Sequence, residues 1–196
     1  MQNSLDFALY IFDMGNVIIR NITTIESIAK HYGFNEAELR FDYNNYNFPL
    51  MDGTISSDQY WQHVAHQFEI QVTGDPLAEF FRPVWNEPVV DIITQLRKLG
   101  KRVVCGSNTY ASHWDYLRAE GFLEIFDGEY ASHEMGVSKP SKYFFTRILD
   151  TEQVAPINTF FIDDYLENVL AAQALGITAH HYRDDQSLED YFKNIL

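Results

Sequence analysis

The 196-residue chain has one cysteine, few basic residues and no long apolar run. Because Cys105 is the only cysteine, an internal disulfide framework is excluded, and we expect the protein in the reducing cytoplasm. No apolar stretch approaches the ~18 residues that a membrane-spanning helix needs. The amino terminus shows no basic segment ahead of an apolar one, so we expect no secretory signal.

Basic residues are outnumbered by acidic ones, 14 Lys and Arg against 28 Asp and Glu, and the formal net charge is −14. A chain of this charge repels nucleic acids and anionic membrane surfaces, so we expect neither as a partner. A phosphate-bearing substrate would therefore have to be met by positive charge concentrated at one place.

Apolar residues are plentiful, with 46% hydrophobic and 15% aromatic residues. This composition is too apolar for a disordered chain. The length is sufficient for a substantial core and fits one α/β domain with a small insert.

Predicted strands and helices alternate along most of the chain, which favours a doubly wound parallel sheet with helices on both faces. The expected strands are Phe7–Phe12, Arg102–Gly106, Gly128–Ser132, Thr159–Ile162 and Thr178–Tyr182. Helical periodicity predicts helices over Val89–Leu99 and from about Asp164 to Leu175. A third helix is expected to begin at Pro140, because proline favours the first helical position.

Residues 21–88 interrupt this alternation with amphipathic segments and little strand signal, and we interpret them as a helical cap inserted after the first strand. Residues 1–20 and 89–196 then form the core. A capping box at Ser56 and Gln59 predicts a helix start within the insert. The aromatic and polar stretch Phe41–Phe48 has two interpretations: internal packing of the cap, or a surface that contacts the substrate.

Chemically active residues follow three of the predicted strands. Asp13 comes after the first strand and before a Gly15-Asn16 turn, Ser107 and Asn108 follow the second, and Asp163 and Asp164 follow the fourth. Ligands bind at the carboxyl ends of strands in open parallel sheets, so these side chains share one crevice if their strands are neighbours. Lys139 lies on a loop that could reach the same point.

At these residues the chain resembles the haloacid dehalogenase-like hydrolase superfamily, and the resemblance spans nearly the whole sequence. It implies that Asp13 is the nucleophile, that Ser107 and Lys139 contact the substrate phosphate, and that Asp163 and Asp164 form the acidic pair. Asn108 would contact either the phosphate or the part of the substrate beside it. The variants Phe12-Asp13-Met14-Gly15-Asn16-Val17 and Ser107-Asn108-Thr109 look most like bacterial sugar-phosphate phosphatases of the α-glucose-1-phosphate type.

The resemblance implies Mg²⁺-dependent hydrolysis of a small phosphorylated metabolite by a monomer or weak homodimer. Mg²⁺ would bind Asp13, the carbonyl oxygen of Gly15 and Asp164, with Asp163 as a further ligand or close neighbour. Attack by a carboxylate divides hydrolysis into two easier steps through an acyl phosphate. Asn168, one helical turn beyond Asp164, is either a supporting residue of the site or part of the helix surface.

The chain departs from the family pattern at Gly15, where most phosphatases of the superfamily place a second aspartate as general acid and base. Two alternatives to the phosphatase therefore remain open. A 2-haloacid dehalogenase would use Asp13 to displace halide at carbon, and such enzymes also lack the second aspartate. A catalytically impaired member would serve only as a binding module.

Overall fold

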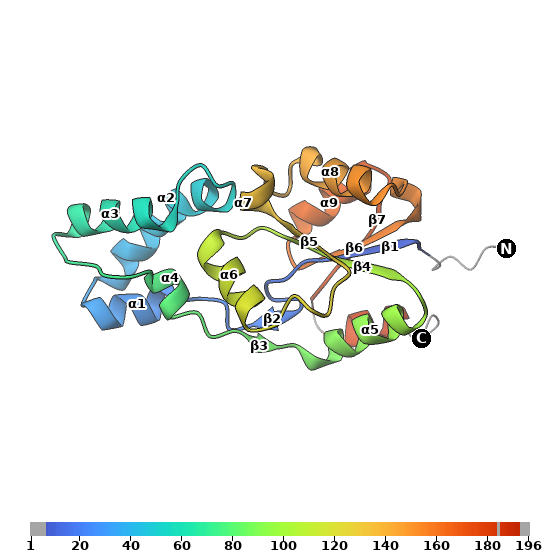
Figure 1. The fold of residues 1–196 in the computed structure, drawn as a ribbon, viewed down its shortest axis with the longest axis horizontal. Helices are drawn as coiled ribbons and strands as arrows, with labels where there is room; N and C mark the ends of the chain where they lie inside the picture. The colour runs from blue at the N-terminus through green and yellow to red at the C-terminus, as the bar shows by residue number, and fades with distance from the viewer. Residues whose placement is uncertain (1–6, 184, 193–196) are drawn as a thin grey trace.

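A five-stranded parallel sheet forms the centre of the molecule, in the order β5-β4-β1-β6-β7 (Figure 1). The computed structural model describes residues 7–183 and 185–192. Its strands are β1 Leu9–Phe12, β4 Arg102–Ser107, β5 Gly128–Ala131, β6 Thr159–Asp163 and β7 Thr178–His181. The predicted parallel α/β sheet is confirmed, although individual strand ends shift. The predicted third strand is one residue too long, because Ser132 begins the short helix α7, Ser132–Met135.

Strand β1 occupies the middle of the sheet, where both faces are covered and every residue is buried. Its continuous apolar sequence is typical of a strand without a solvent-facing side. Phe12 is paired with Cys105 of β4 on one side and with Ile162 of β6 on the other. The chain therefore leaves β1 at Asp13, between the carboxyl ends of two neighbouring strands.

Helices cover both faces of the sheet (Figure 1). The helices α5 Glu87–Lys98, α6 Ala111–Ala119 and α10 Asp185–Phe192 contribute to one apolar cluster. The helices α8 Lys142–Glu152 and α9 Leu166–Ala174 contribute to the other, and a 3-10 turn, η1 Pro156–Asn158, precedes β6.

The helices expected from Pro140 and from about Asp164 each start two residues later in the structure. Helix α8 begins at Lys142 rather than Pro140, because the Ser141 hydroxyl accepts the N–H of Tyr143 at 3.4 Å and caps the helix. Helix α9 begins at Leu166 rather than Asp164. The Asp163 side chain accepts a hydrogen bond from the N–H of Tyr165 at 2.8 Å. This contact holds Asp164 and Tyr165 in a turn ahead of the helix.

The insert consists of four helices: α1 Ile25–Tyr32, α2 Glu36–Met51, α3 Ser57–Phe68 and α4 Pro76–Glu79. The predicted capping box at Ser56 and Gln59 starts α3. The helices share their own apolar cluster, which includes Ile28, Leu39 and Tyr60. This arrangement agrees with a helical cap, while its boundaries at residues 21 and 88 stay a prediction.

A two-stranded antiparallel ribbon, which we did not predict from the sequence, joins the insert to the sheet. It pairs β2 Ile19–Arg20 with β3 Val84–Trp85. Two residues per strand carry too little periodicity to be recognised in a sequence. In the part of the chain that the structure describes, no helix combines the length and apolarity needed to cross a membrane.

Candidate active site

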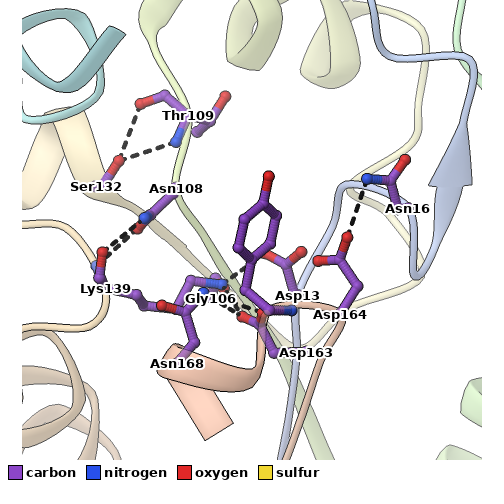
Figure 2. Close-up of polar contacts among 11 residues, drawn as sticks. Asp13, Asn16, Gly106, Asn108, Thr109, Ser132, Lys139, Asp163, Asp164 and Asn168 are labelled. Carbon is purple, nitrogen blue, oxygen red and sulfur yellow. Dashed lines mark hydrogen bonds and ion pairs between the residues drawn. The ribbon is translucent and has the colours of Figure 1, made fainter. Parts of the chain in front are cut away.

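Five of the predicted site residues lie together at the carboxyl ends of β1, β4 and β6: Asp13, Asn108, Lys139, Asp163 and Asp164 (Figure 2). Because β1 lies between β4 and β6, Asp13 is flanked by Ser107 at the end of β4 and Asp163 at the end of β6. Asp164 follows directly in the turn before α9. The sheet order thus provides the neighbouring strands that the sequence argument required.

Lys139 bridges two of the carboxylates. Its Nζ donates to Asp13 Oδ1 at 2.6 Å and to Asp163 Oδ2 at 2.7 Å. A third hydrogen bond, 2.9 Å long, goes to the carbonyl oxygen of Gly106. An ammonium group has three donors, and these contacts account for all three. The side chain is only 1% exposed, so Lys139 is held in one position.

Asp163 is completely buried, and its oxygens are occupied by the protein itself. Besides Lys139, it accepts hydrogen bonds from the N–H of Tyr165 and from Asn168 Nδ2, the latter at 3.0 and 3.1 Å. Asp164 is less constrained. One of its carboxylate oxygens accepts a hydrogen bond from Asn16 Nδ2 at 3.0 Å, and the residue is partly exposed. Of the acidic pair, Asp164 is therefore the freer to bind a ligand.

The cluster carries excess negative charge. Oxygen atoms of Asp13, Asp163 and Asp164 lie within 4.8 Å of one another. With all groups ionised, three carboxylates and the Lys139 ammonium sum to −3 + 1 = −2. A divalent cation would neutralise this charge, and carboxylate oxygens are the ligands that Mg²⁺ prefers. The residues present therefore fit a magnesium ion.

The buried setting shifts the ionisation of these groups. Burial raises the pKa of Asp13 to about 7, with Lys139 acting against the shift and Asp163 adding to it. Burial also raises the pKa of Asp164. It lowers the pKa of Lys139, but the Asp13 and Asp163 carboxylates outweigh that effect and raise the pKa above its ordinary value. Lys139 is consequently a permanent cation of the site.

Asn108 and Ser107 differ in what they contact. Asn108 uses both ends of its amide on the main chain of Lys139, at 2.8 and 2.9 Å. Ser107 is buried, and it lines a cavity together with Asn108 and Gly15. The predicted contact between Asn108 and substrate stays a prediction, whereas its contact with Lys139 is part of the structure.

The cavity lies between the insert and the carboxyl ends of β1 and β4, and its volume is about 360 Å³. On the core side its walls include Met14, Gly15 and Ser107. The insert contributes Asn44 and Asn47 of α2, among others. A molecule whose reactive group lies at Asp13 would extend into this space.

Three residues of the site were not assigned a role from the sequence. Asn16 adopts a left-handed conformation, φ 56°, that asparagine tolerates in turns, and it thereby reaches Asp164. Tyr165 lines the cavity. Asn168, for which two interpretations were open, is buried against Asp163 and is therefore a supporting residue. Only its spacing of about one helical turn from Asp164 could have indicated this role.

The fold and the aspartate–lysine cluster define an α/β enzyme core with a helical insert over its strand ends. Residues 7–176 match the family model described as haloacid dehalogenase-like hydrolase, and the chain belongs to this family of hydrolases. The resemblance to the haloacid dehalogenase-like superfamily seen in the sequence motifs is thereby confirmed.

Relatives of known name include phosphatases. A sesquiterpene phosphatase of Aspergillus oryzae is 30% identical over 138 residues, which cover 67% of this chain and 69% of the relative. A D-ribitol-5-phosphate phosphatase of Bacteroides thetaiotaomicron is 24% identical over 180 residues, covering 85% and 87%. A Bacteroides thetaiotaomicron enzyme of the family, crystallised with magnesium and inorganic phosphate, has a TM-score of 0.78 at 23% identity, covering 90% of this chain and 94% of its own. This last likeness shows a common fold.

Proposed function

We propose that the protein is a Mg²⁺-dependent phosphatase that hydrolyses a small phosphorylated metabolite, such as a sugar phosphate, through an aspartyl phosphate at Asp13. The observation that carries the proposal is the contact of Lys139 Nζ with Asp13 and Asp163, beside Asp164. The nucleophile Asp13, the fixed cation Lys139 and a carboxylate oxygen of Asp164 lie close together. Relatives named as phosphatases support the same reaction class.

Asp13 attacks the phosphorus atom with a carboxylate oxygen, a P–O bond forms, and the bond to the leaving alcohol breaks. The leaving alkoxide takes a proton from solvent water. A water molecule then hydrolyses the acyl phosphate, which gives inorganic phosphate and the free Asp13 carboxylate and releases a proton to solvent. Lys139 holds positive charge beside the transferring oxygens, and the Ser107 hydroxyl can donate to them. Because Lys139 is fixed before substrate arrives, little reorganisation is needed during the reaction.

Mg²⁺ would be held by Asp13, Asp164 and the Gly15 carbonyl oxygen, with Asp163 close behind them. When bound, it would offset the repulsion between the carboxylate nucleophile and an anionic phosphate. The formal charge of the cluster supports this part of the proposal. A buried Cys105 thiol is consistent with the cytoplasmic location expected from the sequence, and we propose a monomer or weak homodimer.

The phosphatase is preferred to the 2-haloacid dehalogenase because of Asp164. Displacement of halide at carbon brings no phosphate charge into the site. Such a reaction needs no cation beside Asp13, and therefore no Asp164 carboxylate to bind one. The same carboxylate is required if a cation must bind beside Asp13. A binding module without activity is also disfavoured, since Lys139 contacts both Asp13 and Asp163, and an Asp164 oxygen lies within 4.8 Å of those carboxylates.

The test measures acetyl phosphate and 4-nitrophenyl phosphate hydrolysis by the purified protein, with Mg²⁺ and with EDTA. Asp13→Asn preserves the shape of the side chain but not the nucleophile, so turnover should fall by roughly 10³-fold or more. Asp164→Ala and EDTA should each abolish activity. Mass spectrometry of the acid-quenched wild type should find phosphate on Asp13.

Activity of Asp13→Asn within tenfold of the wild type would refute the covalent mechanism. Release of chloride from 2-chloropropionate in EDTA, together with no phosphate-ester hydrolysis, would identify a dehalogenase instead.

A further inference from the structure

Asn16 connects the turn after β1 with the turn after β6. Its side-chain Nδ2 donates a hydrogen bond to Asp164 Oδ2 at 3.0 Å (Figure 2). The two residues are 148 positions apart in the sequence, and they meet because β1 and β6 are neighbours in the sheet. Asn16 is exposed, so its side chain adds little to the apolar core. The contact ties an exposed turn residue to a carboxylate of the proposed cation site.

The turn that holds Asn16 is closed by its backbone. The N–H groups of Ile18 and Ile19 both donate to the carbonyl oxygen of Met14 at 3.0 Å. Asn16 adopts φ 56° in this turn, a left-handed conformation that asparagine and glycine both tolerate. Because these hydrogen bonds use no side chain, the turn does not need the Asn16 amide. We therefore look for the role of the amide at Asp164.

The Asp164 carboxylate depends on Asn16 for its orientation. Among the described residues, no other side chain hydrogen-bonds to it, whereas the carboxylate of Asp163 has several partners. The main chain of Asp164 is anchored separately, since its carbonyl oxygen lies 3.0 Å from His181 Nε2. Asn16 is thus the residue that fixes how this side chain is turned.

One oxygen of Asp164 is held by Asn16, and the other is left for a ligand. A carboxylate held at one oxygen has little freedom to rotate, so the contact at Oδ2 also sets the position of Oδ1. Mg²⁺ needs such fixed ligands, because it binds oxygen in a near-octahedral arrangement at about 2.0–2.1 Å. Ca²⁺ accepts roughly 6–8 oxygens at about 2.3–2.6 Å in a more variable arrangement. Loss of orientation at Asp164 should therefore weaken binding of Mg²⁺ more than binding of Ca²⁺.

We propose that Asn16 is a positioning residue that orients Asp164 for a small octahedral cation and thereby shifts the preference of the site toward Mg²⁺ relative to Ca²⁺. The inference rests on the cation site of the proposed phosphatase, and it gives Asn16 a task separate from the chemistry at Asp13. Asparagine is neutral, so its replacement by glycine leaves the charge of the cluster unchanged. A changed preference between two cations of equal charge then reports geometry rather than charge.

Asn21 provides a matched control. It is also an exposed asparagine in a left-handed conformation, φ 60°, and its Nδ2 donates to the carbonyl oxygen of Arg82 at 2.6 Å. Its described partner is therefore a backbone carbonyl rather than a carboxylate. Asn21→Gly reports the general effect of removing such an amide, and Asn16→Gly reports the effect at Asp164. Glycine retains the left-handed conformation at both positions.

The experiment titrates MgCl₂ and CaCl₂ into the EDTA-treated and desalted proteins by isothermal calorimetry, without substrate. Asn16→Gly should raise the Kd for Mg²⁺ roughly tenfold, the low end of what partners of metal ligands contribute, and the Kd for Ca²⁺ by less than about threefold. Asn21→Gly should leave both values unchanged. The Mg²⁺ concentration that gives half-maximal acetyl phosphate hydrolysis should rise with the Kd in Asn16→Gly and stay at the wild-type value in Asn21→Gly. Thermal unfolding in EDTA checks that each variant folds.

Asn16→Asp is the second variant if Asn16→Gly does not fold. Aspartate tolerates the same backbone conformation but, when ionised, cannot donate a hydrogen bond to Asp164. Its added charge attracts both cations, so the preference for Mg²⁺ over Ca²⁺ should fall in this variant as well.

An unchanged ratio of the two Kd values in a folded Asn16 variant would overturn the inference, and so would an equal loss of affinity for both cations. If the wild type still binds Mg²⁺ and hydrolyses acetyl phosphate, such a result leaves the proposed function standing. Absence of Mg²⁺ binding to the wild type would instead refute the proposed cation site, and this inference with it.

Discussion

The side-chain amide of Asn108 forms a pair of hydrogen bonds with the main chain of Lys139. Its Oδ1 accepts the Lys139 N–H at 2.8 Å, and its Nδ2 donates to the Lys139 carbonyl at 2.9 Å. Lys139 in turn contacts both Asp13 and Asp163. Asn108, directly after β4, thus fixes the backbone position of Lys139, the cation that contacts both carboxylates.

Replacement of Asn108 should slow the reaction without unfolding the protein. Asn108→Ala removes both hydrogen bonds, and a displacement of Lys139 by about 1 Å would cost roughly 10²-fold in kcat. Asn108→Asp retains one acceptor but turns a carboxylate toward the Lys139 carbonyl, so we expect it to rescue little. Steady-state kinetics on acetyl phosphate, with thermal unfolding as the control for folding, measure the effect. A kcat of Asn108→Ala within threefold of the wild type would show that the pair is dispensable.

Because Gly15 has no side chain, it cannot donate a proton to the leaving group. Rates of phosphate-ester hydrolysis by the wild type should therefore depend steeply on leaving-group pKa. General acid catalysis contributes ~10²–10⁴-fold, and Gly15→Asp could supply part of this to alkyl phosphates. A Cβ atom at position 15 would lie only 3.0 Å from Ile22 Cδ1, so the single variant should be impaired by crowding.

Gly15→Asp combined with Ile22→Val removes the crowding methyl group and should hydrolyse alkyl phosphates faster than the wild type. Ile22→Val alone is the matched control, and kcat/KM across a phosphate-ester series is the measurement. A flat dependence on leaving-group pKa in the wild type would mean that another residue already donates the proton.

Asp75 connects the insert to the core. It accepts hydrogen bonds from Ser57 at 2.6 Å, from Trp61 at 3.2 Å and from Ser112 of α6 at 2.5 Å, and it also caps α4. Asp75→Ala leaves these donors unpaired, so the free energy of unfolding should fall by about 2–3 kcal/mol. Urea unfolding measures this, with the exposed Asp91→Ala in α5 as control, where we expect a change within about 0.5 kcal/mol. Equal values for both variants would contradict a connecting role.

His113 should make the protein sensitive to acid. It stacks on Phe81 with ring centroids 3.8 Å apart, and burial lowers its pKa from 6.5 to about 3, with Asp75 acting in the opposite direction. Because the folded pKa is below the unfolded value, the unfolded chain binds this proton more readily between those two pH values. The contribution of His113 to stability is complete above pH 6.5 and is lost as the pH falls toward 3.

His113→Gln removes the titrating group, so its unfolding free energy should depend less steeply on pH between pH 6.5 and about 4. Urea unfolding at several pH values gives the slope, and His66→Gln, at an exposed position of α3, controls for loss of an imidazole. An unchanged slope in His113→Gln would show that other groups account for acid sensitivity in this range.

The sequence by itself determined the elements whose signal is local. Continuous apolar runs identify β1 and β6, because strands buried on both faces need no polar alternation. Asp13 and Asp163 follow from these runs as the polar residues at their ends. The motif order led to Lys139, and the lack of strand signal led to the helical insert. Helix starts were less accurate. The predictions relied on Pro140 and on the acidic pair, whereas Ser141 and Asp163 set where α8 and α9 begin.

Only the tertiary structure decided which of these residues meet. Lys139 and Asp13 are 126 positions apart, and their contact depends on β1 lying between β4 and β6. The pairing of Asn108 with the Lys139 backbone and the burial of Asn168 against Asp163 depend on the same arrangement. Such contacts arise from packing between distant segments, and local propensity carries no information about them.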